Sequence, residues 1–197
     1  MALSKTDILN KALTLVGAAA ITSIDDDTNN ARILSRVYES ALRSILYEAK
    51  WNFATTRSTL SLLSITPQWS DTGEIYVYQK PTNVIRIWEA SDKYAAWREE
   101  GDMIYSDTSG LGIRYVYYND TPSTYPAYFS DALIDRLCAD IAYAIVNSAT
   151  LGEKYKTLYE SVSLAKAQSA NSQIGTQQVL MDDAWELAKY NNNQSSS

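Results

Sequence analysis

Ala49-Lys50-Trp51-Asn52-Phe53-Ala54-Thr55-Thr56-Arg57 separates two parts of the chain that have different periodicities. Apolar residues before this stretch recur at helical spacing, and about sixty residues after it have the composition of β-strands. Trp51 and Phe53 place two large rings where the two parts meet, and rings of this size are usually buried. The stretch therefore predicts a junction between a helical region and a β region, with both rings in the core.

Two helices are expected before the junction. Ser4 with Asp7 three residues later approximates a capping box, and Gly17 is a suitable stop after a run of apolar residues at helical spacing. A second helix is expected to begin at Thr28 or Asn29 and to keep one apolar stripe as far as about residue 50.

The polar loop between these helices resembles part of a calcium-binding loop. Asp25, Asp27 and Asn29 match the first three ligand positions, but Asn30 occupies the position that needs glycine and Arg36 the position that needs glutamate. We therefore expect this loop to cap the second helix and to bind no metal.

Residues 55–120 are expected to form short antiparallel strands with no crossover helices. The strands are rich in β-branched and aromatic residues, and turns are expected at Pro81 and Gly101. The expected strands are 75–78, 84–88, the two arms of a hairpin over 98–105, and 113–118.

Helical spacing returns after Pro122 and Pro126. A third helix is expected over 129–145, a break at Gly152, and a fourth helix over 155–165. From about Ser169 the chain becomes polar, and residues 191–197 are expected to be disordered. One apolar island interrupts this polar end; it consists of Val179, Leu180, Met181, Trp185 and Leu187.

Together these patterns predict an α+β fold. We expect a four-helix bundle with an antiparallel β subdomain inserted between helices two and three, and an extended C-terminal tail. The expected boundaries are 1–54 and 123–172 for the bundle, 55–122 for the β subdomain and 173–197 for the tail.

Composition excludes several classes of protein. The 197 residues carry a net charge of −6, so specific DNA binding through clustered lysine and arginine is not expected, although an acidic protein can surround DNA without gripping it. One cysteine allows no intrachain disulfide, and no apolar run is long enough to span a membrane. Asp7 and Lys11 interrupt the N-terminal apolar segment, which disfavours a signal peptide.

The sequence offers no set of catalytic residues. It has no histidine, which removes the Ser-His-Asp and Cys-His arrangements and the usual zinc ligands. Cys138 lies on an apolar helical ridge and is expected to be buried and inert. Ser163 and Lys166 match the Ser-x-x-Lys pattern of β-lactamases, but the companion Lys-Thr-Gly triplet is missing. Gly152-Glu153-Lys154 lacks the spacing of a phosphate loop.

Paired carboxylates are the remaining candidates for chemistry. Glu99, Glu100 and Asp102 flank a turn, and Asp182 and Asp183 lie near the C-terminus. A glycosidase needs two carboxyl groups across a cleft, whereas most acidic runs are solvated loops. We expect no catalytic residue, no metal site and no cofactor.

The order of several segments resembles the head-to-tail adaptor family of tailed bacteriophages, whose short-tailed members include tail tubular protein A. The likeness covers roughly residues 4–172, and Gln79-Lys80-Pro81 differs from the Leu-Pro of the family. The matching segments are Asp7-Ile8-Leu9-Asn10, Leu15-Val16-Gly17, Trp51-Asn52-Phe53-Ala54, Tyr76 to Trp88, Gly101 to Asp107, Phe129 to Ala142, and Tyr159 to Ala170.

This resemblance implies a structural virion protein of the neck, assembled in the host cytoplasm, that forms a homo-oligomeric ring, typically a dodecamer. The implied partners are further copies of the chain, the portal protein, the tail nozzle protein and the double-stranded DNA in the channel, with no membrane. Exposed Tyr and Trp would suit ring contacts. We expect subunit or nozzle contacts from Tyr76, Tyr78, Trp88 and Trp97, and docking of the Val179–Leu187 island on another subunit, on the portal, or on the protein's own helices.

Two alternatives remain at this point. The first is a tail-associated hydrolase of cell-wall or capsule glycans that uses Glu99, Glu100 and Asp102. The second is a head-completion or stopper protein that plugs the channel.

Overall fold

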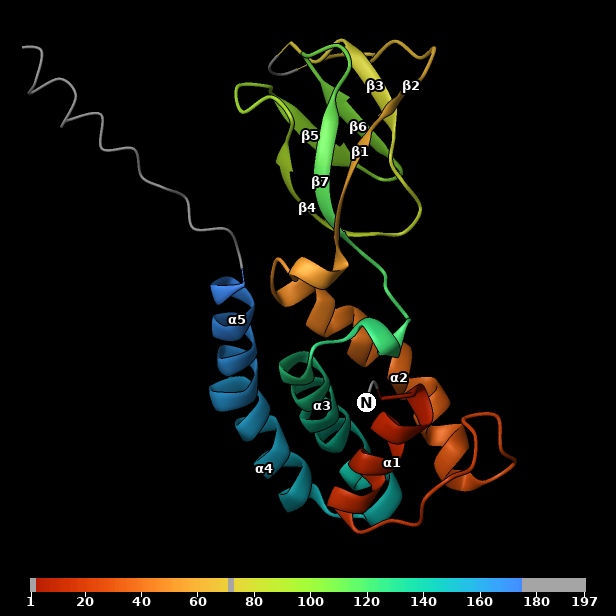
Figure 1. Cartoon of the computed structure of the whole chain (residues 1–197). Helices are drawn as coiled ribbons and strands as arrows, with labels where there is room; N and C mark the ends of the chain where they lie inside the picture. The colour runs from red at the N-terminus through yellow and green to blue at the C-terminus, as the bar shows by residue number, and fades with distance from the viewer. Residues whose placement is uncertain (1–2, 71–72, 175–197) are drawn as a thin grey trace, which may run out of the picture.

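The computed structural model describes residues 3–70 and 73–174, and these form an α+β fold (Figure 1). The C-terminal apolar island and residues 191–197 lie outside this part of the chain. The helices are α1 Lys5–Val16, α2 Asn29–Glu48, α3 Ala127–Val146, α4 Ala149–Leu158 and α5 Leu164–Gln173, with 3-10 turns at Asn52–Ala54 and Pro122–Thr124. The strands are β1 Thr55–Thr59, β2 Ser61–Leu62, β3 Tyr76–Gln79, β4 Val84–Ala90, β5 Trp97–Glu100, β6 Met103–Ser106 and β7 Gly112–Tyr117.

The first two helices begin and end as their sequences predict. The backbone N–H of Asp7 donates to Ser4 Oγ at 3.1 Å, and the backbone N–H of Ser4 donates to the Asp7 carboxylate at 2.9 Å, which completes the capping box. Gly17 ends α1 in the left-handed region with φ of 80°. Thr28 caps α2 by accepting a hydrogen bond from the N–H of Ala31 at 3.2 Å.

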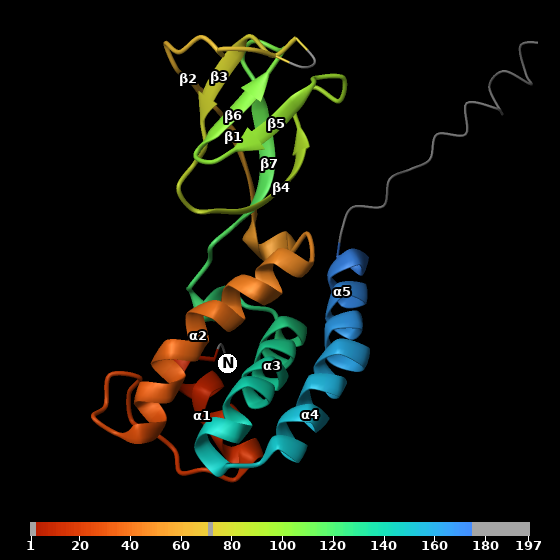
Figure 2. The same cartoon turned by 180° about the vertical axis from the view of Figure 1, so that it is seen from behind.

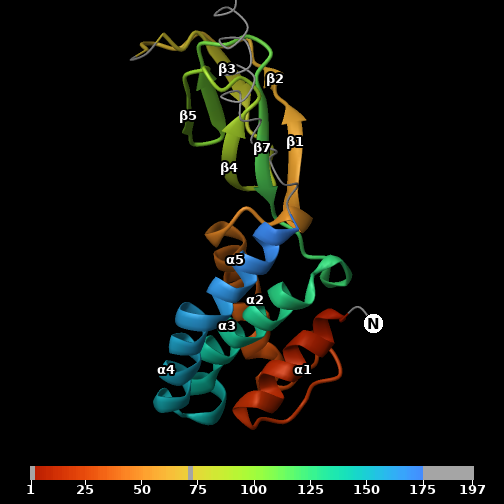
Figure 3. The ribbon, with the colours of Figure 1, turned by 60° about the vertical axis from the view of Figure 1, so that its left-hand side comes forward.

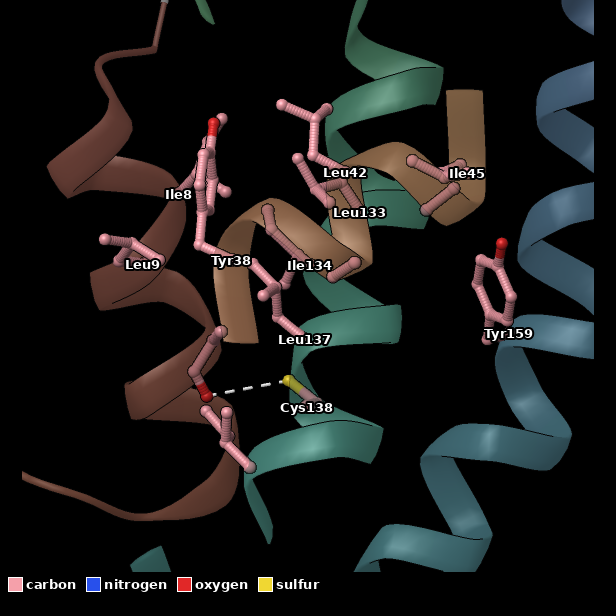
Figure 4. Packing of buried hydrophobic residues seen from close by; sticks show 14 of the residues in the cluster. Ile8, Leu9, Tyr38, Leu42, Ile45, Leu133, Ile134, Leu137, Cys138 and Tyr159 are labelled. Carbon is pink, nitrogen blue, oxygen red and sulfur yellow. Dashed lines mark hydrogen bonds between the residues drawn. The ribbon is translucent and has the colours of Figure 1, made fainter. Parts of the chain in front are cut away.

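Helix α3 lies at the centre of the helical region, because it packs against α1, α2 and α4. Leu133, Leu137 and Cys138 of α3 point toward Ile8 and Leu9 of α1 and toward the residues of α2 that Figure 4 shows. All five of these side chains are fully buried, and so are Leu42 and Ile45 of α2. The apolar helical ridge that carries Cys138 therefore forms part of the main core.

The predicted break at Gly152 is wrong. Helix α3 ends instead at Asn147, which adopts the left-handed conformation with φ of 51°, and Ser148 caps α4. Gly152 lies inside α4 because the helix runs close to α3: a Cβ at this position would lie 3.4 Å from the carbonyl oxygen of Ala139. From α4 the chain continues through one π-helical turn, Tyr159–Ser163, directly into α5.

The strands form two antiparallel sheets, one in the order β1-β7-β4 and the other in the order β2-β3-β6-β5. The predicted hairpin is confirmed: β5 and β6 pair around Gly101, which has φ of 60°. A second core contains side chains from both sheets, among them Tyr78 and Ile104 of one sheet and Ile113 and Tyr115 of the other.

The sheets stand at one end of the helical region, as Figures 1 and 2 show. The chain enters them through β1, directly after α2, and leaves through β7 on its way to α3. These two strands pair from the point of entry, where Thr55 lies opposite Val116. In the described part of the chain, no helix is both long and apolar enough to cross a bilayer.

Candidate interaction surfaces

The junction stretch is held by a cluster of aromatic rings. Trp51 is fully buried, and its indole N–H donates to the carbonyl oxygen of Ile45 at 2.7 Å. Its ring lies edge-on to Phe129 of α3 with centroids 5.0 Å apart, and Phe53 contacts the same ring at 4.6 Å. The predicted core anchor is confirmed for Trp51, while Phe53 is partly buried against the same core.

The last helix is fastened to this junction by one buried asparagine. Asn171 of α5 is 6% exposed, and its side-chain oxygen accepts a hydrogen bond from the backbone N–H of Asn52 at 2.9 Å. Its side-chain nitrogen donates to the carbonyl oxygen of Lys50 at 2.8 Å. The end of α5 therefore lies beside the point where the chain enters the sheets.

Three of the four aromatic residues predicted as ring or nozzle contacts are half-buried in the β region or at its base, and the fourth is buried. Tyr78 is 1% exposed and its hydroxyl donates to the carbonyl oxygen of Thr108 at 2.7 Å, so its side chain offers no surface to a partner. Tyr76 and Trp97 are half-buried against the core between the sheets.

Trp88, the remaining predicted contact, braces the β region against α2. The guanidinium of Arg86 lies over the Trp88 ring at 4.2 Å and over the Tyr47 ring at 4.9 Å, and it donates to the carbonyl oxygen of Tyr47 at 3.2 Å. The indole nitrogen of Trp88 is buried and has no hydrogen-bond partner in the described chain. Trp88 is thus part of a bridge between the two regions.

A more exposed apolar surface, which the sequence patterns did not predict, lies on the connection between β2 and β3. Figure 3 shows this connection extending away from the two sheets. We call the exposed side chains of this connection, together with Leu62 at the end of β2, the apolar loop: Leu62, Ile65, Trp69 and Ile75, with exposed fractions of 59, 46, 69 and 62%. The sequence does contain one indication of this surface: large apolar residues around Pro67 that follow neither helical nor strand periodicity.

An ion pair between a buried carboxylate and a half-buried arginine anchors the base of the apolar loop. Glu74 is 4% exposed; one of its oxygens lies 2.8 Å from Nη2 of Arg98, and the other accepts a hydrogen bond from the Ser70 hydroxyl at 2.7 Å. Because a buried carboxylate needs such partners, these contacts fix the direction in which the loop leaves the sheet. A cavity of about 170 Å³ beside them is lined in part by Pro67, Trp69 and Glu100.

The carboxylates considered for glycan hydrolysis do not converge in the described chain. Glu99 pairs with Lys80 at 2.9 Å, and Glu100 lies 3.7 Å from Arg98. As neighbours on β5, the two side chains point to opposite faces of the sheet. Asp102 follows at the turn, where its carbonyl oxygen accepts from the N–H of Lys80. Asp182 and Asp183 lie outside the described residues.

The calcium-like loop serves as a capping loop. The Asp26 carboxylate accepts hydrogen bonds from the backbone N–H groups of Ser23 and Thr22, and these bonds lower the pKa of Asp26. Asp27 forms an ion pair with Arg32 of α2. Within residues 3–70 and 73–174, no group of three or more acidic or cysteine side chains is placed to hold a metal ion.

The remaining nucleophile candidates, Cys138 and Ser163, are held by contacts within the helical region. Cys138 is buried, its thiol lies 3.5 Å from the carbonyl oxygen of Ala12, and burial raises its pKa to about 12. The Ser163 hydroxyl donates to the carboxylate of Asp135, and Lys166 is exposed one turn away. The sequence matches no family model and no curated protein at a significant level.

Proposed function

We propose that this protein is a structural virion protein, a head-to-tail adaptor that assembles as a homo-oligomeric ring below the portal and carries the tail nozzle. The observation that supports this most is the apolar loop. Exposed large apolar side chains normally occur singly on a monomer, and a group of them at one end of a subunit is typical of a protein-binding surface. The ordered sequence resemblance points to the same class of partner.

The two regions of the fold suit different contacts in such a ring. We regard α1, α2, α3 and the joined α4 and α5 as a four-helix bundle that forms the body of the ring. Each subunit would present one side to the next copy and the opposite side to the previous one, because head-to-tail contacts close into rings. The β region, which carries the apolar loop, would dock the nozzle.

The charge of the chain suits a channel for DNA. A net charge of −6 gives the ring an overall field that repels phosphates, so DNA would pass without sequence-specific binding. Residues Val179–Leu187 would dock on a neighbouring subunit or on the portal, with packing on the protein's own helices as the alternative. The site of action would be the virion neck.

The proposal is tested by measuring the mass of the purified protein in solution and by imaging it with electron microscopy, with and without portal rings. We expect a closed ring with an open lumen that binds coaxially to the portal. Failure to bind portal rings over a range of salt and protein concentrations would contradict the proposal, and a closed lumen would indicate a stopper. As a matched control, the double variant Trp69→Ser with Ile75→Ser should retain portal binding but lose nozzle binding.

A further inference from the structure

The outer face of the β1-β7-β4 sheet concentrates positive charge. Arg57 of β1 and Arg114 of β7 lie directly opposite each other in the register, and their side chains point away from the core between the sheets. Glu89 of β4 forms an ion pair with Arg114 and lies 3.4 Å from the ammonium group of Lys50. We call these four residues the arginine face.

The charges of the arginine face are not balanced within the described chain. Three cations share one carboxylate, which leaves a local charge of 3 − 1 = +2 in a protein whose net charge is −6. Arg57 is exposed and forms no ion pair with any described residue, and like charges opposite each other destabilise a sheet. A hollow of about 550 Å³ lies over this part of the sheet, with Thr59 and Ser91 also in its lining. An acidic, extended ligand would fit such a surface.

The chain itself leads toward this face. Asn171, one turn before the end of the described chain, donates a hydrogen bond to the carbonyl oxygen of Lys50, and Lys50 lies next to Glu89. The described chain therefore ends, at Ile174, close to Lys50 of the arginine face. Asp182 is eight residues further on, and eight extended residues span up to about 27 Å. The five-residue strand β1 is only about 17 Å long, so the whole face is within reach.

The C-terminal sequence has the complementary charge. Residues 175–197 contain three carboxylates, Asp182, Asp183 and Glu186, and one cation, Lys189, so this segment has a net charge of 1 − 3 = −2. Trp185 lies among these carboxylates, and indole rings stack well on guanidinium groups.

We propose that residues 176–190 of each chain bind to the arginine face of the same chain, with their carboxylates neutralising Arg57 and Arg114. This contact is intramolecular and does not depend on ring formation. It gives the free subunit a covered face, and the segment leaves that face when it docks on another partner.

The test uses two introduced cysteines in the full-length chain, Thr59→Cys on β1 and Ala184→Cys in the segment. Cys138 is buried and does not compete for the cross-link. At low protein concentration, oxidation should give an intrachain disulfide about tenfold faster than in the control pair Thr14→Cys with Ala184→Cys, because docking raises the effective concentration of the two thiols. Thr14 is exposed on α1, which lies at the opposite end of the molecule (Figure 1). Equal rates for the two pairs would overturn the proposal.

Charge reversal tests the cause of the cross-link. Arg57→Glu with Arg114→Glu should slow it to the rate of the control pair, and adding Asp182→Arg with Asp183→Arg should restore it. Raising the salt concentration should also slow the cross-link in the Thr59→Cys with Ala184→Cys protein that keeps Arg57 and Arg114. This measurement does not depend on whether the charge-reversal variants fold. Disulfide-linked dimers in place of the intrachain product would contradict the intramolecular contact. Binding of a labelled DNA duplex to the arginines, with no cross-link, would assign the face to nucleic acid and also overturn the proposal.

Discussion

Asn171 and Asn52, 119 residues apart in the chain, are joined by two hydrogen bonds. The side-chain oxygen of Asn171 accepts from the backbone N–H of Asn52 at 2.9 Å, and its carbonyl oxygen accepts from the side-chain nitrogen of Asn52 at 2.8 Å. The end of the last helix is thereby fixed to the junction between the helical region and the sheets.

The first prediction concerns this asparagine. Asn171→Ala removes two part-buried side-chain hydrogen bonds, one to the backbone of Asn52 and one to that of Lys50, so we expect a loss of about 1–3 kcal/mol in the free energy of unfolding. Urea denaturation measures this loss. Ser169→Ala, an exposed position on the same helix, is the control and should change stability by less than about 0.5 kcal/mol. Equal midpoints for the two variants would show that Asn171 does not fasten the junction.

The second prediction separates buried from exposed tryptophan. Trp51→Ala should lower the free energy of unfolding by about 3–5 kcal/mol, because it empties a fully buried site in the aromatic cluster. Trp69→Ala, which truncates a side chain that is 69% exposed, should change stability by less than about 0.5 kcal/mol. Denaturant unfolding of the two variants side by side checks the contrast, and a similar loss in both would place Trp69 in a packed environment.

The third prediction concerns assembly through the apolar loop. Trp69→Ser with Ile75→Ser should weaken nozzle binding at least tenfold while the unfolding midpoint of the subunit stays the same, since both side chains are largely exposed. Analytical ultracentrifugation of mixtures with the nozzle protein gives the affinity. Tyr94→Ser, at a side chain that is 81% exposed on a different turn, should bind the nozzle normally. If Tyr94→Ser weakened nozzle binding to the same extent, the loss would come from making the surface more polar at any position, and not from the apolar loop.

The fourth prediction is a loss of stability in alkali. Burial raises the pKa of the Cys138 thiol and of the Tyr159 hydroxyl, each to about 12, from ordinary values of 9.0 and 10.0. Between about pH 9 and 12 the unfolded chain releases these protons while the native protein keeps them, so the unfolded state is favoured as pH rises. The urea midpoint should therefore fall across this range.

Single variants check which groups cause the alkaline loss. Tyr159→Phe and Cys138→Ala should each flatten the dependence of the midpoint on pH, and Tyr143→Phe, at an exposed ring on α3, should leave it unchanged. Tyr159→Phe should also cost little stability at pH 7, because its buried hydroxyl has no hydrogen-bond partner in the described chain. An unaltered slope in both buried variants would contradict the assignment.

The parts of the fold that sequence predicted well are those set by neighbouring residues. The capping box at Ser4, the stop at Gly17 and the hairpin at Gly101 depend on local backbone chemistry, and each was confirmed. Gly152 was misread because its role is set by contact with α3, which local sequence does not reveal. The true break at Asn147 needs a left-handed residue, a conformation that asparagine tolerates better than most residues.

The candidate surfaces were harder to predict for a related reason. Tyr78 and Trp69 are both aromatic residues of the β region, yet one is 1% and the other 69% exposed. Which ring faces the core depends on how two sheets pack together, and composition alone does not contain that information. Trp88 likewise takes part, through Arg86 and Tyr47, in a contact between the β region and α2. Local sequence patterns predict these two regions separately and do not reveal the contact between them.

Because β7 pairs with β1 at Val116 and with β4 at Val116 and Tyr117, the strand that leads back to the helices is held on both sides where it leaves the sheet. A strand that is paired on both sides cannot rotate independently of its neighbours. The Arg86 side chain adds a contact between this sheet and α2 through the ring and the carbonyl oxygen of Tyr47. The sheets and the helical region therefore meet at a seam of three paired strands and one cation, so a load applied to the sheets would be transmitted to α2 and not absorbed at the junction.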